Sequence, residues 1–456
     1  MSQPVSRPSS AFVPSSFATF RFVDRRLDPD GRVSLTYALD DRLEFTERFE
    51  LPAPGPLGDE EIAAAEPLLD LLHLVAGVSY FKTAVPPEVA VETTPPTPAV
   101  AELLEALYSE GLGEFAYRNE LPGLPRPRFP RRAARAVPSG GEPGVPRTLV
   151  PIGGGKDSLV AVEVLRRSGQ DFALFSVGDP EPIARTAAAT GVERHVARRT
   201  LDPSLRELNE AGALNGHVPV TAIVSCAALL TARLNGFTRV AMANERSASD
   251  ANLRWNGTAI NHQFSKGLAC ERLLRAALAE VAPDLGYFSV LRPASELAIA
   301  RAFARYPQYH DRFTSCNAVF RLDPTRRAAN WCGDCPKCRF VFLALAPFLD
   351  PERLVAIFGR DLLDDEGQYE GFALLAAVGG HKPFECVGEE EESIAAFRLL
   401  AADERWKEHA VVRRFASTVL PTLPDSAGDP EEALRCSAEH HVPSDLVASV
   451  DEVLGC

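Results

Sequence analysis

The chain has 456 residues, of which 46% are hydrophobic and 24% charged, so a sizeable buried core is expected and global disorder is excluded. The net charge of −14 argues against general affinity for nucleic acid or for an anionic membrane surface. Nine cysteines in a chain of this length, three of them crowded together, fit a reducing compartment and a metal site better than a disulfide framework, so we expect a cytoplasmic protein.

Residues 1–140 are predicted to form a small α+β unit. Apolar residues cluster on both sides of the turn sequence Asp28-Pro29-Asp30-Gly31, which is typical of a β-hairpin. Two later stretches carry apolar residues with the period of an amphipathic helix. The expected strands are Phe20–Val23, Val33–Ala38 and Leu43–Leu51, and the expected helices are Glu60–Val75 and Pro98–Gly111.

The flanking segments of this unit are expected to be irregular. Met1–Ser16 is rich in Ser and Pro and lacks the charged-then-apolar pattern of a signal peptide, so it is interpreted as a loose tail. Arg132–Arg147, rich in Arg, Pro and Gly, is interpreted as a linker. The longest apolar stretches, around Ala222–Leu230 and Phe340–Leu349, are too short to cross a bilayer, so no membrane insertion is expected.

Residues 141–350 alternate between strand-like and helix-like segments. This alternation predicts an α/β domain with a parallel sheet covered by helices on both faces. Ligands of such sheets bind beyond the carboxyl ends of the strands, where the strand order reverses. The expected strands are Leu149–Ile152, Phe172–Val177, Arg194–Ala197 and Arg239–Met242, and the expected helices include Glu181–Thr190 and Val218–Leu234.

A glycine-rich loop follows the first of these strands and precedes a helical pattern. Glycines let the backbone approach an anion, the helix N-terminus adds a partial positive charge, and a lysine adds a full one. The loop is neither a Walker A sequence nor GxGxxG. It resembles the SGGxDS loop of the PP-loop ATP pyrophosphatases, with glycine in place of the usual serine. The residues expected to hold ATP phosphates are Gly153, Gly154, Gly155, Lys156, Asp157 and Ser158.

Within this loop Asp157 suits a Mg²⁺ ligand, because hard Mg²⁺ prefers a carboxylate together with phosphate oxygens. The alternative is an ordinary glycine-rich β–α turn. Two further strand ends are candidates for nucleotide contacts: Phe175–Gly178, which includes Ser176 and where an adenine ring is expected, and the segment that begins at Asn244.

Four cysteines form the second strong signal. Cys316 is followed by Cys332, Cys335 and Cys338, and the last three make two successive C-x₂-C steps. Four thiolates are enough to close a tetrahedral structural Zn²⁺ site, which leaves no open position for catalysis. The same ligands would serve an iron–sulfur cluster, and reduced cysteines without metal are the remaining alternative.

Residues 351–456 are predicted to be mainly helical and acidic. One stretch, Gly379–Gly388, carries His381, Lys382 and Cys386 together. Such a turn can supply a proton base and an anion contact. A free cysteine that only fills core space is the alternative.

Taken together, these residues resemble one family, the UDP-N-acetyl-α-D-muramoyl-L-alanyl-L-glutamate epimerases of bacterial peptidoglycan synthesis. The similarity leaves out only the two ends of the chain. It runs through Ser79–Pro86, Gly111–Asn119, Gly153–Ser158, Asn215–Pro219, Asn244–Ala248, Asn261–Lys266, Leu291–Leu297, the cysteine cluster and Gly380–Gly388.

The resemblance implies an isomerase that uses ATP and Mg²⁺, releases AMP and diphosphate, and inverts the terminal L-Glu of UDP-MurNAc-L-Ala-L-Glu to D-Glu. It also implies a functional link to a ligase that adds L-Glu. Lys156, Cys386 and His381 are the expected catalytic residues, with the last two moving the α-proton. The expected substrate contacts are His217, Glu245, His262, Lys266 and Arg292.

Two other functions fit part of the sequence. Another PP-loop enzyme, such as a deazaguanine synthase or a tRNA thiolase, would share the loop and the cysteines, but the acidic charge disfavours a tRNA substrate. A nucleotide-binding regulator without turnover would bind ATP and release no diphosphate.

Overall fold

The computed structural model describes residues 12–134, 145–321, 325 and 327–456. The beginning of the predicted tail and most of the predicted linker therefore lie outside the described residues. The chain divides into two compact units, which are treated separately below. Unit 1 comprises residues 1–139, 197–235 and 276–283, and unit 2 comprises residues 140–196, 236–275 and 284–456. Residues 351–456 thus fall in the same unit as the glycine loop.

The predicted hairpin and third strand of unit 1 are confirmed. β1 (Thr19–Leu27), β2 (Arg32–Leu39) and β3 (Leu43–Glu50) form an antiparallel meander. Gly31 sits in the first turn with φ of +81°, and a Cβ there would lie 2.5 Å from the carbonyl oxygen of Leu51, so only glycine fits. Sequence analysis missed β4 (Glu88–Val91), a short strand parallel to β1.

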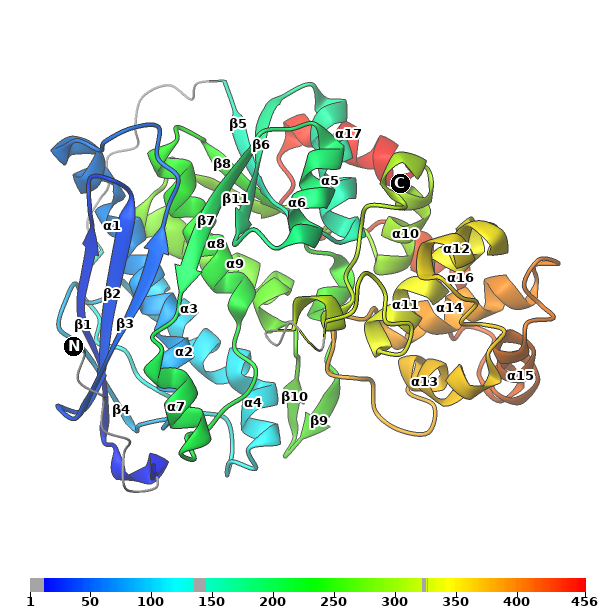
Figure 1. Cartoon of the computed structure of the whole chain (residues 1–456), viewed down its shortest axis with the longest axis horizontal. Helices are drawn as coiled ribbons and strands as arrows, with labels where there is room; N and C mark the ends of the chain where they lie inside the picture. The colour runs from blue at the N-terminus through cyan, green and yellow to red at the C-terminus, as the bar shows by residue number, and fades with distance from the viewer. Residues whose placement is uncertain (1–11, 135–144, 322–324, 326) are drawn as a thin grey trace. The chain divides into compact units, whose positions relative to one another are not determined.

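Helices cover this meander in unit 1, as the blue and cyan ribbons of Figure 1 show. The first one, α1 (Asp59–Ala76), packs on β1 and on α8, and its core-facing leucines are fully buried. The predicted helices are confirmed to within two residues at each end. The other helices of the unit are α2 (Val78–Phe81), α3 (Pro98–Ser109), α4 (Gly113–Arg118), α7 (Ser204–Glu210) and α8 (Val220–Leu234).

One stretch of unit 1 corrects the sequence analysis. Asp59–Phe81, which joins α1 and α2, is long and apolar enough to cross a membrane by length and composition, with a mean hydropathy of 1.4. The acidic residues near its start hid this in the sequence. Since 67% of the most apolar window is buried inside the protein, the stretch behaves as a core helix.

Unit 2 contains the predicted parallel sheet, in the strand order β11-β8-β5-β6. The chain runs from β5 outward to β6 and then returns to the other side of β5 with β8, so the strand order reverses between β5 and β8. The strands are β5 (Arg147–Pro151), β6 (Asp171–Val177), β8 (Arg239–Met242) and β11 (Gly286–Ser289), the last of which sequence analysis missed. β7 (Arg194–Thr200) crosses the division between the units, and its end pairs with β3.

The rest of unit 2 is largely helical, apart from a small hairpin of β9 (Leu253–Trp255) and β10 (Thr258–Ile260). α9 (Leu268–Val281) crosses the division between the units. The predicted helical character of the C-terminal region is confirmed, and α17 lies beside α5 in Figure 1. The helices are α5 (Lys156–Ser168), α6 (Glu181–Thr190), α10 (Glu296–Ala304), α11 (Pro336–Leu345), α12 (Pro351–Phe358), α13 (Tyr369–Ala373), α14 (Glu390–Ala401), α15 (Ala410–Thr418), α16 (Pro430–Leu434) and α17 (Ser444–Leu454).

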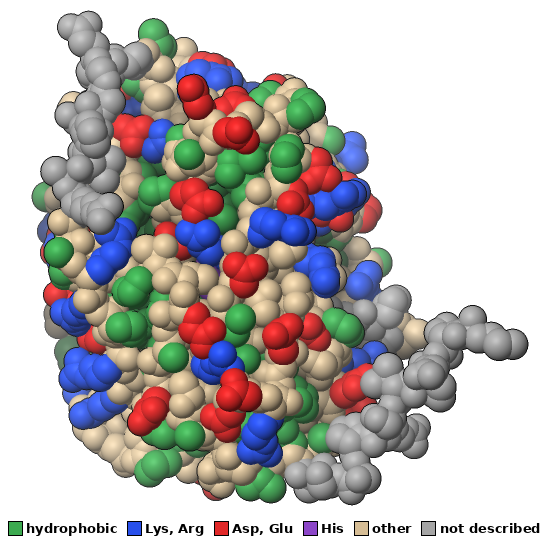
Figure 2. All heavy atoms as spheres, turned by 90° about the vertical axis from the view of Figure 1, so that its left-hand side faces the viewer, with side chains coloured by type: hydrophobic (Ala, Val, Ile, Leu, Met, Phe, Trp, Pro, Cys, Tyr) green, Lys and Arg blue, Asp and Glu red, His purple; other side chains and the backbone are tan. Residues whose placement is uncertain are grey.

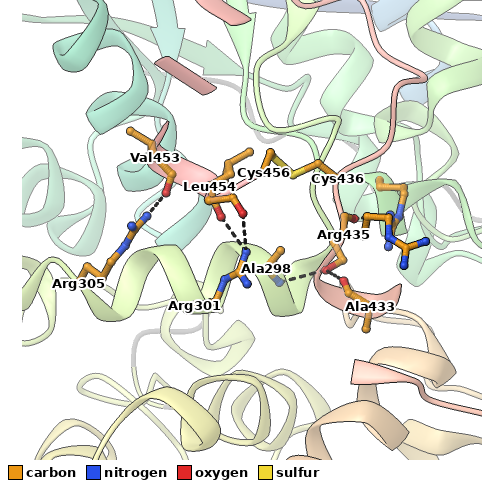
Figure 3. Close-up of a disulfide and its surroundings, with 12 residues drawn as sticks. Ala298, Arg301, Arg305, Ala433, Arg435, Cys436, Val453, Leu454 and Cys456 are labelled. Atoms are coloured by element: carbon orange, nitrogen blue, oxygen red, sulfur yellow. Dashed lines mark hydrogen bonds between the residues drawn. A yellow bond between two sulfur atoms is a disulfide. The ribbon is translucent and has the colours of Figure 1, made fainter. Parts of the chain in front are cut away.

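A disulfide closes the C-terminal end, although the cysteine usage favoured a reducing compartment and predicted no such bond. Cys436 is bonded to Cys456, with their Cα atoms 5.5 Å apart (Figure 3). In the same view Arg301 and Arg305 of α10 donate hydrogen bonds to backbone carbonyls at the end of α17. These contacts hold α17 against the helices that carry the candidate site.

Candidate active site

The glycine loop and the segment that begins at Asn244 lie at the point where the strand order reverses. The loop follows β5 and Asn244 follows β8, and these two strands are neighbours in a parallel sheet. Asn244 is 5% exposed and its amide donates to the hydroxyl of Ser289 at 3.1 Å, at the end of the next strand. The structure therefore brings both segments to the edge of the sheet at which ligands of such folds bind.

The loop has the backbone of an anion cradle. Gly154 has φ of +89°, a conformation that favours glycine, and Gly153 has open space where a Cβ would stand. Gly155 caps α5, whose first residue is Lys156. The first backbone N–H groups of this 13-residue helix have no partners within the helix, as at any helix start. The hydroxyl of Ser158 donates to the carbonyl of Gly155 at 2.9 Å, which tightens the turn.

A buried charge cluster surrounds Lys156, which is 1% exposed. Its ammonium group donates to the carboxylates of Asp157 and Glu296, and Lys337 lies 3.5 Å from the other oxygen of Glu296. Burial lowers the pKa of Lys156, but the two carboxylates more than offset it and raise that pKa above its ordinary value. For Glu296 burial raises the pKa, and the two ammonium groups lower it further than burial raises it. Lys156 and Glu296 are therefore both charged near neutral pH.

Hydrogen bonds from its backbone N–H fix the position of Glu296. It is the first residue of α10, and its N–H donates to the hydroxyl of Ser247 at 3.2 Å and to the carboxyl of Glu392 at 3.1 Å. Ser247 belongs to the segment after β8, so the same contacts join the sheet edge to α10 and α14. Glu296 was not predicted as a site residue, because Ser295-Glu296 is typical of an ordinary helix start. Lys337 was not predicted either, because it stands between cysteines of the predicted metal site.

Cys386 lies in the same cluster. Its Sγ is 3.4 Å from the ammonium nitrogen of Lys266, the ring of His262 is hydrogen bonded to the thiol, and its carbonyl accepts from Lys337. Burial raises the pKa of Cys386, but Lys266, the hydrogen bond from His262 and the charge of Lys337 lower it to about 7. A substantial share of this thiol is therefore thiolate at neutral pH.

Arg292 positions the neighbouring segments. It is 1% exposed, and its guanidinium donates to the backbone carbonyls of Glu245 and Lys266 and to the carboxylate of Glu271, which lies 3.0 Å away. These bonds fix the two loops that carry predicted site residues and indicate a positioning role. The Glu245 side chain is 2% exposed; burial raises its pKa, Lys266 lowers it, and the charge of Glu296 raises it again.

Three predicted site residues have contacts outside the cluster around Lys156 and Cys386. His381 is exposed, with Nδ1 near the carbonyl of Lys382 and its ring near Phe384, so the structure pairs Cys386 with His262 and Lys266 instead. The hydroxyl of Ser176 is 3.0 Å from the carbonyl of Gly178 and donates to it. His217 belongs to unit 1, where it lies 3.9 Å from the carboxylate of Glu114.

The four cysteines of the predicted metal site converge in unit 2. All four Sγ atoms lie within 4.8 Å of one another, and neighbouring pairs are separated by 3.5 Å to 4.0 Å. Four thiolates at the usual Zn–S bond length would be separated by about 3.8 Å in a tetrahedron. Cys316, Cys332, Cys335 and Cys338 therefore fit a single Zn²⁺ ion in composition and spacing.

Comparison with known proteins gives one consistent family. Residues 11–290 match the MurL N-terminal domain and residues 312–429 match the MurL C-terminal domain. Three similar proteins are all named UDP-N-acetyl-alpha-D-muramoyl-L-alanyl-L-glutamate epimerase. The protein of Micromonospora sp. is 49% identical and aligns over 91% of this chain and 93% of its own. That of Xanthomonas oryzae pv. oryzae is 46% identical over 96% and 98%, and that of Salinispora tropica is 49% identical over 87% of each.

Proposed function

The chain belongs to the MurL family, and from this premise we propose that it is an isomerase that converts the terminal L-Glu of UDP-MurNAc-L-Ala-L-Glu into D-Glu. The relatives carry the name of this activity, and they match the chain over most of its length. The substrate name links the reaction to peptidoglycan precursor synthesis.

The chemical difficulty is the α-proton of a carboxylate. Its removal would build negative charge beside a group that is already negative. We propose that ATP is the co-substrate that removes this obstacle. A carboxylate oxygen of the glutamyl residue attacks the α-phosphorus, diphosphate leaves, and the resulting mixed anhydride is neutral at the carbonyl. The α-proton then comes within reach of a side-chain base. A proton returns to the opposite face of Cα, and water finally releases AMP and the inverted glutamyl carboxylate.

The observation that carries this proposal is the chain of contacts between the glycine loop and Cys386. Lys156 binds Glu296, Glu296 binds Lys337, and Lys337 donates to the carbonyl of Cys386. A group suited to phosphate charge and a group suited to proton transfer thus share one buried network in unit 2. Activation and proton removal need this proximity, because they act on neighbouring atoms of one glutamyl residue.

In this proposal the PP-loop residues Gly153–Ser158 receive the ATP phosphates, and Lys156 moves from its carboxylate partners to the phosphoryl charge. Asn244 and Ser176 lie at strand ends where the nucleoside is expected. Asp157 would hold Mg²⁺, which would neutralise phosphate charge. The four cysteines would hold a structural Zn²⁺ that fixes the start of α11 and hence Lys337.

For proton transfer we propose Cys386 as the base, with Lys266 stabilising its thiolate and His262 orienting it. His262 and Lys266 replace His381 as the partners of Cys386. Glu245 lies within electrostatic range of Lys266 and remains a candidate contact of the glutamyl group.

We further propose a cytoplasmic protein without nucleic-acid partners that works with an L-Glu-adding ligase. On the face drawn in Figure 2, basic and acidic side chains are intermixed over the described residues. Such a surface does not offer the continuous basic stripe that nucleic acid needs.

The proposal is tested by incubating the protein with ATP, Mg²⁺ and UDP-MurNAc-L-Ala-L-Glu, and by measuring AMP, diphosphate and the chirality of glutamate after acid hydrolysis. We expect D-Glu together with AMP and diphosphate. D-Glu formed without AMP would overturn the ATP part of the proposal, and AMP formed without D-Glu would overturn the epimerase part.

A further inference from the structure

Three segments of unit 1 that sequence analysis singled out, and that the proposed chemistry leaves unused, meet around Lys82. The amide oxygen of Asn215 accepts from the ammonium group of Lys82 at 2.6 Å and from the N–H of Gly216 at 2.9 Å. Asn119, at the end of α4, donates to the carbonyl of Asn215 at 3.0 Å. The backbone is also joined, because the N–H of Leu214 donates to the carbonyl of Thr83 at 3.0 Å.

Lys82 is a buried cation without a carboxylate partner among the residues that the structure describes. It is 7% exposed, and its only hydrogen-bond acceptor there is the neutral amide of Asn215. Burial alone lowers its pKa to about 8, with no compensation from a nearby negative charge. Burying a full charge in this way is costly, and proteins usually pair such a group.

The side chain that contacts Lys82 is open to solvent. Asn215 is exposed, and no acceptor within the described part of the chain takes the hydrogens of its Nδ2. The backbone on both flanks is strained: Val85 has φ of +51° and Glu120, which follows Asn119, has φ of +53°. A β-branched residue in this conformation is rare, and such strain concentrates at ligand sites.

A cavity of about 760 Å³ lies on the same three segments. Its walls include Ala84 and Val85, which follow Lys82, Leu121 and Pro122, which follow Asn119, and Leu214, which precedes Asn215. The volume is typical of a small-molecule site. Pro14–Ala18 and Gly123–Pro125 complete most of the remaining wall. Lys82 and Asn215 stand one or two residues along the chain from wall residues, so the cavity leaves room for the organic part of an anion held by these two polar groups.

We propose that Lys82 and Asn215 form an anion subsite in unit 1 that binds the diphosphate of a uridine nucleotide sugar. The ammonium group supplies the charge and the exposed amide of Asn215 supplies a second donor. That the natural ligand is the UDP end of the substrate rests on the proposed function. The subsite itself rests on the burial, the single neutral partner and the converging segments.

The test uses the full chain, with no ATP present and UDP as the probe, and measures UDP affinity by titration calorimetry. We expect Lys82→Met to lower the affinity for UDP about tenfold or more. Asn215→Asp, which places a negative charge on an exposed side chain, should weaken it at least as much and keeps the test valid if Lys82→Met fails to fold. Lys407→Met is the matched control, because Lys407 is already paired with Glu404, and it should leave UDP affinity unchanged.

Two further ligands, ATP and the dipeptide L-Ala-L-Glu, test whether the anion bound at this subsite is the diphosphate of UDP. ATP affinity should be unchanged in both variants, because ATP is assigned to the glycine loop. The dipeptide L-Ala-L-Glu should also bind as in the wild type. Unchanged UDP affinity in Asn215→Asp, or a loss confined to the dipeptide or to ATP, would overturn the proposal. If UDP affinity does not depend on Lys82 while the protein still epimerises its substrate, this inference is wrong and the proposed function stands.

Discussion

The buried lysines of the two units differ in the partners of their ammonium groups. In unit 2, Lys156 and Lys337 contact the carboxylate of Glu296 and Lys266 contacts the thiol of Cys386. In the described part of unit 1, the ammonium of Lys82 donates only to the amide of Asn215. The cluster of unit 2 is internally neutralised, so a ligand must exchange partners with groups already bound to one another. Among the residues that the structure describes, the ammonium of Lys82 has no partner of opposite charge to give up, so an anion gains the whole charge interaction.

The largest effect is expected where a neutralised pair is broken. Lys156→Met should reduce AMP release by about a thousandfold or more, because it removes the charge assigned to the phosphoryl group. It should also lower the free energy of unfolding by about 3–5 kcal/mol, since buried Glu296 would lose the nearer of its two cations and keep only Lys337. Stopped assays of AMP and chemical denaturation measure the two effects.

A double variant separates these two roles of Lys156. Lys156→Met combined with Glu296→Gln should regain most of the stability without regaining AMP release. If the double variant recovered AMP release, Lys156 would act only in stabilising the fold. The functional contrast drawn between Lys156 in unit 2 and Lys82 in unit 1 would then be wrong.

The next effect concerns the thiol. Cys386→Ala should slow epimerisation about a hundredfold to ten-thousandfold, the usual contribution of a positioned proton-transfer group. Exchange of radiolabelled diphosphate into ATP in the presence of the dipeptide substrate should persist, because the glycine loop is untouched. His381→Ala is the control and should leave both rates unchanged. A loss in His381→Ala equal to that in Cys386→Ala would restore His381 as the partner.

A smaller effect is expected from the cation beside the thiol. The pKa of Cys386 is about 7, so the thiolate fraction and the rate should rise with pH through about 7. Removing the ammonium in Lys266→Met disfavours the thiolate and raises that pKa above the ordinary thiol value of about 8.5, because burial then acts with less opposition. At pH 7 the rate should fall about tenfold or more and recover at higher pH. If the rising limb of the pH–rate profile lies at the same pH in Lys266→Met as in the wild type, this account is contradicted.

The two units also differ in what their sequences revealed. Strands and helices with clear periodicity were predicted closely, down to β8 (Arg239–Met242) and α6 (Glu181–Thr190). The three glycines before Lys-Asp-Ser correctly predicted a turn between β5 and α5, because glycine permits the positive φ found at Gly154. Glu296 and Lys337 could not be found, since each stands in a segment with another local explanation. The state of Lys82 depends on burial and on Asn215, 133 residues away, which no local pattern reports.

The last effect concerns stability and not activity, and it lies in unit 1. The folded pKa of Lys82, about 8, lies below its unfolded value of about 10.5, so the unfolded chain binds more protons between these pH values. Stability of the unliganded wild type should therefore rise with pH relative to Lys82→Met, by up to about 3 kcal/mol between pH 7 and 10.5. Denaturant titrations of both proteins across this range give the difference. A difference that does not change with pH would mean that Lys82 is not a buried, unpaired cation.

The central claim is that a nucleotide must activate the glutamyl carboxylate before its α-proton can leave. It is tested most directly by incubating the wild-type protein and UDP-MurNAc-L-Ala-L-Glu in D₂O with ATP, with α,β-methylene ATP, or with no nucleotide. The α,β-methylene analogue cannot release diphosphate. Mass spectrometry should show deuterium at the glutamyl Cα, together with D-Glu, only when ATP is present. Equal deuterium uptake without nucleotide or with the analogue would contradict the account.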